Sequence, residues 1–114
     1  MIHKTKFFDN LEKLIAENGV FIERKSGTCH PKYPDFVYIV DYGYIRGTQS
    51  QDGNEIDIFV GTCNNGVIGC LVTLDLYKKD SEIKVLFNCN DDEISKICLM
   101  MNHPPMSCVL LRKW

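Results

Sequence analysis

Hydrophobic positions along the chain form two helical patterns that frame a group of short strands. A first helix is predicted over residues 6–17, because apolar side chains recur there at helical spacing and Asn18-Gly19 can end it. Its apolar positions are Phe7, Phe8, Leu11, Leu14 and Ile15. A second helix is predicted over residues 91–101, closed by Pro104-Pro105. Both helices therefore have one face suited to packing on a core.

Between and after these helices, short runs of β-branched and aromatic residues predict strands. The expected strands cover residues 20–24, 36–40, 55–60, 67–76, 83–87 and 106–111. Residues 41–53 contain three glycines and are expected to be mostly turn, and residues 77–82 are expected to form a charged loop. This pattern predicts an α+β fold: a small OB-like five-stranded β-barrel in a single domain over residues 1–114, with helices near the two ends.

Composition narrows the choice of partners. The chain has 114 residues, a formal net charge of −2 and a pI of about 5.9, so we expect no nucleic-acid partner. It has no apolar leader and no stretch long enough to span a bilayer, which predicts a cytoplasmic protein that does not enter membranes. Six cysteines without an export signal are expected to remain thiols. We also expect the chain to form a homo-oligomer.

The segment from Gln51 to Val60 carries the most informative polar residues. Ile56 and Ile58 take one face of the expected strand, which leaves Asp57 on the other face within an otherwise apolar run. A carboxylate in such a place is costly unless it is paired or binds a metal. Asp52 and Asn54 lie in the turn just before. Oxygen ligands of this kind suit Mg²⁺, although a solvent-facing Asp-Gly-Asn turn is the simpler interpretation of these residues alone.

Two further features favour a metal and phosphate site. Tyr42, in Asp41-Tyr42-Gly43-Tyr44-Ile45, can donate its hydroxyl to a phosphate oxygen. Glu82 and Lys84 share a strand face, where one could bind metal and the other phosphate. Each feature also has a plain alternative, namely aromatic packing for Tyr42 and a solvated ion pair for Glu82 and Lys84.

These motifs resemble the signature of soluble (type I) inorganic pyrophosphatases. Tyr-Gly-Tyr-Ile followed by Asp-Gly-Asn-Glu-Ile-Asp reproduces the family's spacing without gaps over residues 33–60. Glu82-Ile83-Lys84 resembles the family's later Asp-x-Lys, and Glu23 falls where the family has an early strand glutamate. Because the chain is shorter than a typical member, it is most similar to short pyrophosphatase-like proteins.

The resemblance implies hydrolysis of pyrophosphate to two phosphates with Mg²⁺ as cofactor. It implies Asp52, Asp57 and Glu82 as metal ligands, and Tyr42 and Lys84 as phosphate-binding residues. A further metal aspartate is expected before Glu82, with Asp80 preferred and Asp75 second. Lys25, Lys32 and Arg46 lie in loops near the expected site and could supply positive charge. The catalytic group predicted on this basis is Asp52, Asn54, Asp57 and Tyr42.

The sequence also departs from the family pattern. Asn54 occupies the position of the aspartate that takes the proton from the nucleophilic water, and an amide cannot act as a base. The family's phosphate-binding arginine aligns with His30, and its C-terminal Tyr-Lys pair has no clear counterpart, with Arg112 and Lys113 the residues that could stand in for it. A weak phosphohydrolase is therefore the first hypothesis. The second is a catalytically impaired module that binds phosphate or a nucleotide, and the third is a barrel used for protein contacts.

Overall fold

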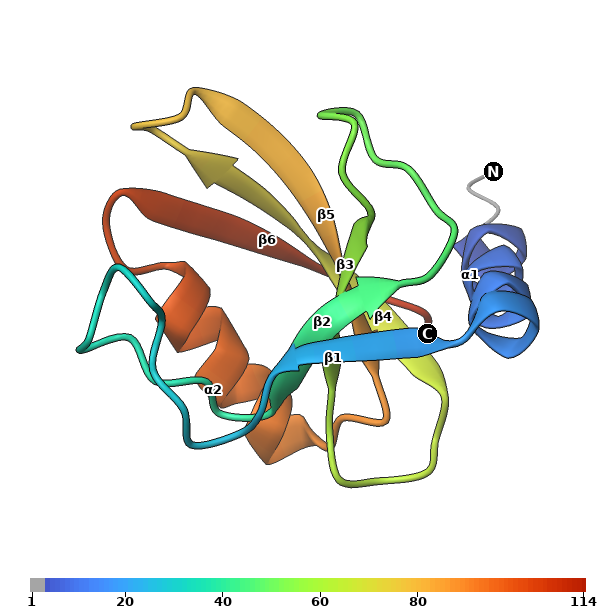
Figure 1. Ribbon diagram of the computed structural model, residues 1–114. Coiled ribbons are helices and arrows are strands. Elements are labelled where there is room, and N and C mark those ends of the chain that lie inside the picture. The colour runs from blue at the N-terminus through green and yellow to red at the C-terminus, as the bar shows by residue number, and fades with distance from the viewer. Residues whose placement is uncertain (1–3) are drawn as a thin grey trace.

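Two helices lie on opposite faces of one mixed β-sheet in the computed structural model, which describes residues 4–114 (Figure 1). The elements in chain order are α1 (Lys4–Asn18), β1 (Val20–Arg24), β2 (Asp41–Ile45), β3 (Ile56–Val60), β4 (Val67–Asp75), β5 (Asp80–Phe87), α2 (Asp91–Met101) and β6 (Met106–Arg112). Within the described range the sheet has six strands in the order β1-β2-β3-β5-β4-β6. The α+β class and both helices agree with the sequence prediction.

The strand order brings together residues that are far apart in the sequence. β3 and β5 pair in parallel, with Asp57 opposite Lys84, whereas the other neighbouring strands pair antiparallel. β5 lies between β3 and β4 because it folds back along β4 through the tight turn after Asp75. This order carries the Glu82–Lys84 segment to the side of β3, which a simple meander of consecutive strands would not do.

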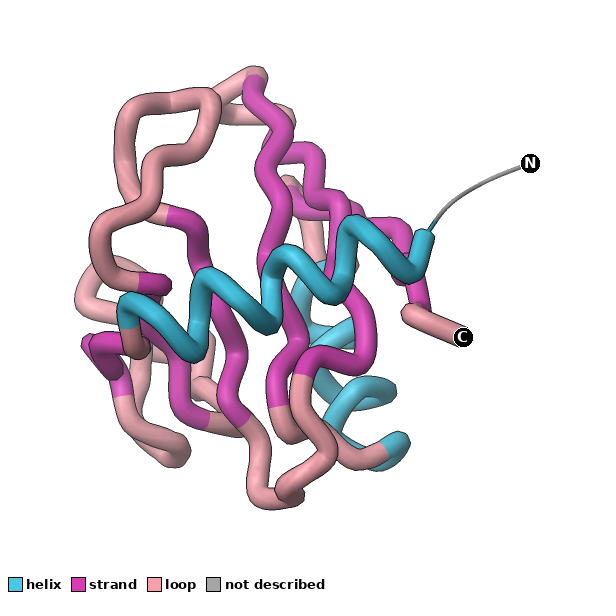
Figure 2. The backbone as a smooth tube through the Cα atoms, turned by 90° about the vertical axis from the view of Figure 1, so that its right-hand side faces the viewer, coloured by secondary structure: helices cyan, strands magenta, loops and turns pink. Residues whose placement is uncertain are grey.

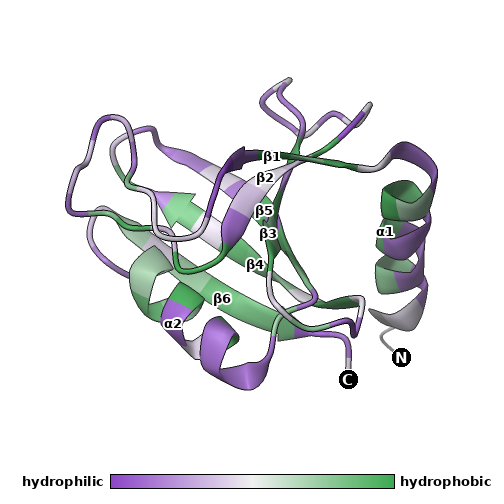
Figure 3. Cartoon of the chain, turned by 60° about the horizontal axis from the view of Figure 1, so that its bottom comes forward, coloured by the Kyte–Doolittle hydropathy of each residue, from purple (hydrophilic) through white to green (hydrophobic). Residues whose placement is uncertain are grey.

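Each face of the sheet has its own hydrophobic core. On one face, Phe8 and Leu11 of α1 pack with buried residues of the strands, including Ile58 and Val85. Figure 2 shows α1 lying across the strands, and Figure 3 shows its hydrophobic side turned towards the sheet. On the other face, α2 packs over a separate core. Its buried members are Tyr38, Val40, Phe59, Ile68, Leu71, Leu86, Cys89, Ile94, Ile97 and Met101. Burial of strands on both faces explains why β4 is almost continuously apolar.

Two sequence predictions about this sheet need correction. Residues 36–40 form no named strand; they pair only locally with the preceding loop, through a bridge between Cys29 and Val37. The strand is instead Asp41–Ile45, which was predicted to be turn. Aspartate and glycine are turn signals, but here Gly43 is required inside the strand.

The closed five-stranded barrel is not confirmed. In the described part of the chain β1 and β6 are the two ends of an open strand order, and no pairing joins them. The charged loop expected at residues 77–82 is also shorter than predicted, because β5 already begins at Asp80. The sixth strand and the open order leave one concave face on which α2 covers only part of the surface (Figure 1).

Gly43 allows β1 and β2 to approach each other. A Cβ atom at this position would lie 1.8 Å from the carbonyl oxygen of Phe21 and 2.9 Å from the Cα atom of Ile22. Both contacts are with backbone, which cannot move aside as a flexible side chain can. The glycine between the two tyrosines is therefore needed for the pairing of β1 with β2.

We expect Gly43→Ala to lower the free energy of unfolding by more than about 3 kcal/mol, because the added methyl group must push the two strands apart. Urea denaturation followed by circular dichroism measures this. The control is Gly27→Ala, where φ is 86° and no atom lies within 4 Å of the new methyl group. It should cost only about 1–2 kcal/mol, from the left-handed backbone alone. Equal losses in the two variants would contradict the close approach.

Candidate metal and phosphate site

The ammonium group of Lys84 forms the centre of the candidate site. Its Nζ atom donates to the hydroxyl of Tyr42 at 2.8 Å, to Oδ2 of Asp57 at 2.8 Å and to Oε2 of Glu82 at 3.1 Å. The side chain of Lys84 is only 8% exposed, so these contacts take place largely out of water. An ammonium group has three hydrogens, and each of them has a protein acceptor here.

Strand register explains why these side chains meet. Asp57 lies opposite both Tyr44 and Lys84, and Tyr42 lies opposite Phe59, so these residues share the concave face of the sheet. Glu82 joins them because it precedes Lys84 by two positions on β5. The expectation that Asp57 points away from Ile56 and Ile58 is consistent with this placement, since Ile58 lies in the core under α1.

The charges in this group stabilise one another. Burial alone would lower the pKa of Lys84, but the neighbouring Tyr42 and Asp57 outweigh it and the pKa is raised, so the amine stays charged. Burial raises the pKa of Tyr42, and the charge of Asp57 adds to this effect, so the phenol stays neutral. Burial also raises the pKa of Glu82, although Lys84 acts in the opposite direction. Lys84 is thus a permanent cation within hydrogen-bonding distance of two carboxylates.

A group of three carboxylates lies directly beside the ammonium group. Asp52, Asp80 and Glu82 each offer an oxygen atom, and these atoms all lie within 4.8 Å of one another. Opposite ligands of an octahedral Mg²⁺ ion are about 4.2 Å apart, so small side-chain movements would suffice for shared coordination. The donor set, hard oxygens with negative charge, suits Mg²⁺. Glu82 belongs to this acidic trio and also contacts Lys84, so it connects the two groups.

Hydrogen bonds within the turn fix the position of Asp52. Its Oδ1 atom accepts from the hydroxyl of Ser50 at 2.5 Å and from the backbone amide of Asn54 at 3.0 Å. The Ser50 hydrogen bond, followed by the one from Asn54, lowers the pKa of Asp52 to about 2, so this exposed carboxylate stays charged near neutral pH. The side-chain amide of Asn54 approaches Oδ2 of Asp52 at 3.4 Å, which places it next to the acidic trio.

The two aspartates considered before Glu82 have different surroundings. Asp80 lies in the acidic trio. The Oδ1 atom of Asp75 accepts hydrogen bonds from the backbone amides of Tyr77 and Lys78, at 2.8 and 3.1 Å, and so stabilises the turn between β4 and β5. The structure therefore favours Asp80 over Asp75 as the residue available to a cation. Asp57 lies outside the trio, and its Oδ2 atom accepts from the Lys84 ammonium group.

The other predicted phosphate-binding residues are more dispersed. The ring of His30 packs against Tyr33 and Phe36, and its Nδ1 atom accepts from the backbone amide of Lys32 at 3.0 Å. Burial, and then the positive charge of Arg24, lower its pKa, so His30 is neutral near pH 7. The guanidinium group of Arg46 stacks on Phe21, 5.3 Å from the ring centroid.

Lys25 and Lys32 are exposed, as is Glu23 on β1. Arg24, which the sequence did not single out, contacts the aromatic residues that lead to Tyr42. No simple sequence signal marks it, because a strictly alternating strand would not turn it towards this face.

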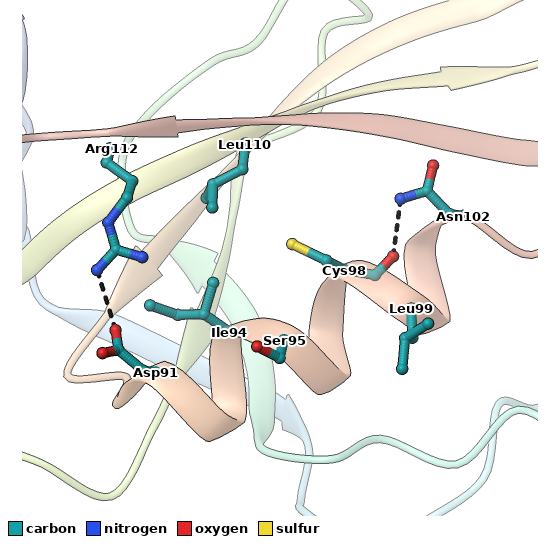
Figure 4. A pocket seen from close by; sticks show the side chains of 8 residues that line it. All are labelled: Asp91, Ile94, Ser95, Cys98, Leu99, Asn102, Leu110 and Arg112. Carbon is teal, nitrogen blue, oxygen red and sulfur yellow. Dashed lines mark hydrogen bonds and ion pairs between the residues drawn. The ribbon is translucent and has the colours of Figure 1, made fainter.

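A separate hollow of about 550 Å³ lies between α2 and β6 (Figure 4). Its lining consists of Asp91, Ile94, Ser95, Cys98, Leu99, Asn102, Leu110 and Arg112. An ion pair between Arg112 and Asp91, with nitrogen and oxygen 3.0 Å apart, spans one end of it. None of the acidic trio lines this hollow, so the candidate site is not formed there. Within residues 4–114, no helix is long and apolar enough to cross a membrane.

Comparisons with known proteins identify the family of this chain. The sequence model of the family described as inorganic pyrophosphatase matches residues 20–97, which is more than half of the chain. The chain therefore belongs to the inorganic pyrophosphatase family. Among curated proteins, no significant match is found.

Solved structures of pyrophosphatases share the fold. An inorganic pyrophosphatase from Neisseria gonorrhoeae superposes with a TM-score of 0.64 at 17% identity, over 85% of this chain and 84% of the other. The enzyme from Helicobacter pylori gives a TM-score of 0.55 at 14% identity, over 82% and 81% of the two chains. At such identities the likeness establishes the fold, and the roles of individual residues must come from the geometry above.

Because Asp80 belongs to the acidic trio and Asp75 does not, we expect Mg²⁺ binding to require Asp80. Calorimetric titration should show that Asp80→Asn weakens Mg²⁺ binding at least about tenfold, because one of three charged ligands is lost. Asp75→Asn is the matched control on the same hairpin, and asparagine can keep the turn that Asp75 stabilises. It should leave the affinity within about twofold of wild type. A larger loss in Asp75→Asn than in Asp80→Asn would show that the cation binds elsewhere.

Lys84→Met should lower the free energy of unfolding by about 3 kcal/mol at pH 7, because it leaves Asp57 and Glu82 half-buried without their cation. Burial raises the pKa of Glu82, and the variant loses the Lys84 charge that opposes this shift, so the variant gains stability relative to wild type as pH falls from 7 towards about 4. The control is Lys96→Met, which removes an exposed i,i+4 pair with Asp92 and should cost less than about 0.5 kcal/mol. A pH-independent loss in Lys84→Met would contradict this explanation.

Proposed function

We propose that this protein is a slow, Mg²⁺-dependent phosphohydrolase that converts inorganic pyrophosphate to two phosphates. The observation that carries the proposal is the position of the acidic trio against the Tyr42–Lys84 pair, in a chain of the inorganic pyrophosphatase family. Carboxylates supply a place for the cation, and the ammonium and phenol groups supply donors for phosphate oxygens.

The residues of this chain have distinct tasks in the proposed reaction. Asp52, Asp80 and Glu82 would hold the cation, which would neutralise phosphate charge and make water more acidic. Lys84 stays charged and exchanges one of its carboxylate contacts for a phosphate oxygen, while Tyr42 holds the lysine in position and offers its hydroxyl. Asp57 keeps the Lys84 ammonium group directed at the concave face.

Proton removal from the attacking water is the weak step in this scheme. Asn54 lies next to Asp52, but its amide has no basic lone pair that could take a proton near neutral pH. This observation also favours a second candidate function: a module that binds a phosphate-containing ligand or nucleotide on the same face without turnover.

Phosphate release from pyrophosphate with Mg²⁺ tests the proposal. Wild type should release phosphate slowly, Asp57→Ala should abolish release, and Asn54→Asp should raise kcat by about 10²-fold because it restores a carboxylate beside the water. Asn64→Asp, an amide-to-acid change in the turn after β3, is the matched control and should leave kcat unchanged. Wild type that binds pyrophosphate but turns over only as Asn54→Asp would establish the binding module instead. Absence of both binding and turnover would reject the two functions together.

The other expectations from the sequence remain predictions. These are a single domain, a homo-oligomer, a cytoplasmic location and the absence of a nucleic-acid partner.

A further inference from the structure

A β-bulge in β1 decides which charge faces the candidate site. Phe21 pairs with Tyr44 and shares its face, so in a regular strand Glu23 would pair with Tyr42. The register instead shifts between Ile22 and Arg24, and Arg24 lies opposite Tyr42. Glu23 is exposed, whereas Arg24 is half-buried. The extra residue therefore replaces an anion with a cation on the concave face, which is the kind of reorientation that bulges near functional sites produce.

Tyr38 connects Arg24 to Tyr42. Its Nη1 atom donates to the hydroxyl of Tyr38 at 2.6 Å, and its guanidinium carbon lies 5.6 Å from the centroid of that ring. The ring of Tyr38 stacks on Tyr42 with centroids 5.2 Å apart. The hydroxyl of Tyr42 accepts from Lys84. Lys84 of β5 thus contacts the Tyr42 phenol directly, and Arg24 of β1 is connected to the Tyr42 ring through Tyr38.

The guanidinium group contacts the hydroxyl of Tyr38 but forms no ion pair with a carboxylate among residues 4–114. Arg24, Lys32 and Lys78 all lie close enough to His30 to lower its pKa, so three positive charges lie around this ring. A half-buried cation without an anion is costly unless a ligand completes it. One side of the concave face is therefore acidic and the other basic, with Tyr42 between them.

Charge balance shows why a second cation is needed. Asp52, Asp57, Asp80 and Glu82 bring four carboxylates to this face, and Lys84 is the one cation that contacts any of them among the described residues. A single divalent ion would still leave the group negative. A ligand with two adjacent phosphoryl groups then needs further positive charge, and Arg24 is the unpaired cation nearest to Tyr42 in the strand register.

We propose that Arg24 binds one phosphoryl group of the substrate while Lys84 binds the other, so that the bulge in β1 determines preference for a diphosphate over a single phosphate. This inference rests on the proposed function, because it assigns a residue to the same site. A planar guanidinium group can engage two oxygens of one phosphoryl group, which adds orientation to charge.

The test compares Mg²⁺-pyrophosphate and Mg²⁺-phosphate in wild type, Arg24→Gln, Arg24→Lys and Arg112→Ala. Affinity is measured by the ligand-induced rise in melting temperature and, where there is turnover, by KM and kcat. We expect Arg24→Gln to weaken pyrophosphate binding about 10- to 100-fold and phosphate binding less than about threefold. Arg24→Lys should recover part of the loss. Arg112→Ala, an arginine paired with Asp91 beside α2, should bind both ligands as wild type does.

The outcomes separate this proposal from the proposed function. If wild type neither binds nor hydrolyses pyrophosphate, both are rejected. If wild type binds pyrophosphate but Arg24→Gln retains its affinity within twofold, the role of Arg24 alone is rejected. A merely structural role is recognised by equal losses for pyrophosphate and phosphate together with a fall in the melting temperature of the free protein, and that result would also overturn the proposal. Glutamine can keep a hydrogen bond to Tyr38, so Arg24→Gln is expected to fold.

Discussion

The buried ammonium group of Lys84 is the interaction on which the candidate site depends. It holds a phenol and two carboxylates from three different strands on the concave face. Removal of that one charge would leave Asp57 and Glu82 facing each other with little solvent to separate them. Because Glu82 also belongs to the acidic trio, the same ammonium group fixes one carboxylate of the proposed metal site. The same hydrogen bonds of Lys84 therefore stabilise the strands and position the residues of the proposed site.

Two irregularities of β1 and β2 complete this network. Gly43 lets the strands approach so closely that a methyl group has no room, and the bulge after Ile22 then turns Arg24 towards Tyr42. Neither feature contributes a large hydrophobic contact. They set the direction of side chains: Arg24, rather than Glu23, lies opposite Tyr42 in the strand register. The acidic and basic halves of the concave face are thus a consequence of local backbone geometry as much as of composition.

The sequence predicted those features that follow from regular periodicity. Helical spacing located both helices. Strand alternation placed the side chains of Asp57 and Ile58 on different faces of the sheet, and those of Glu82 and Lys84 on the same face. It failed where irregular backbone or distant pairing decides the outcome. Residues 41–45 were predicted as turn because glycine disfavours strands, and the parallel pairing of β3 with β5, which joins Asp57 to Lys84, has no local signal. The bulge in β1 likewise has no sequence signal, so the sequence did not predict that Arg24 lies opposite Tyr42. The roles of the site residues remain proposals.

The most direct test of the central claim, that metal and phosphate meet on this concave face, is a crystal structure of the protein soaked with Mn²⁺ and phosphate. Anomalous scattering would locate the metal independently of any assumption about its ligands. The account predicts Mn²⁺ among the carboxylates of Asp52, Asp80 and Glu82, with phosphate oxygens in contact with Lys84. Manganese bound outside this trio, with the ammonium group still holding both of its carboxylates and no phosphate beside it, would contradict the account.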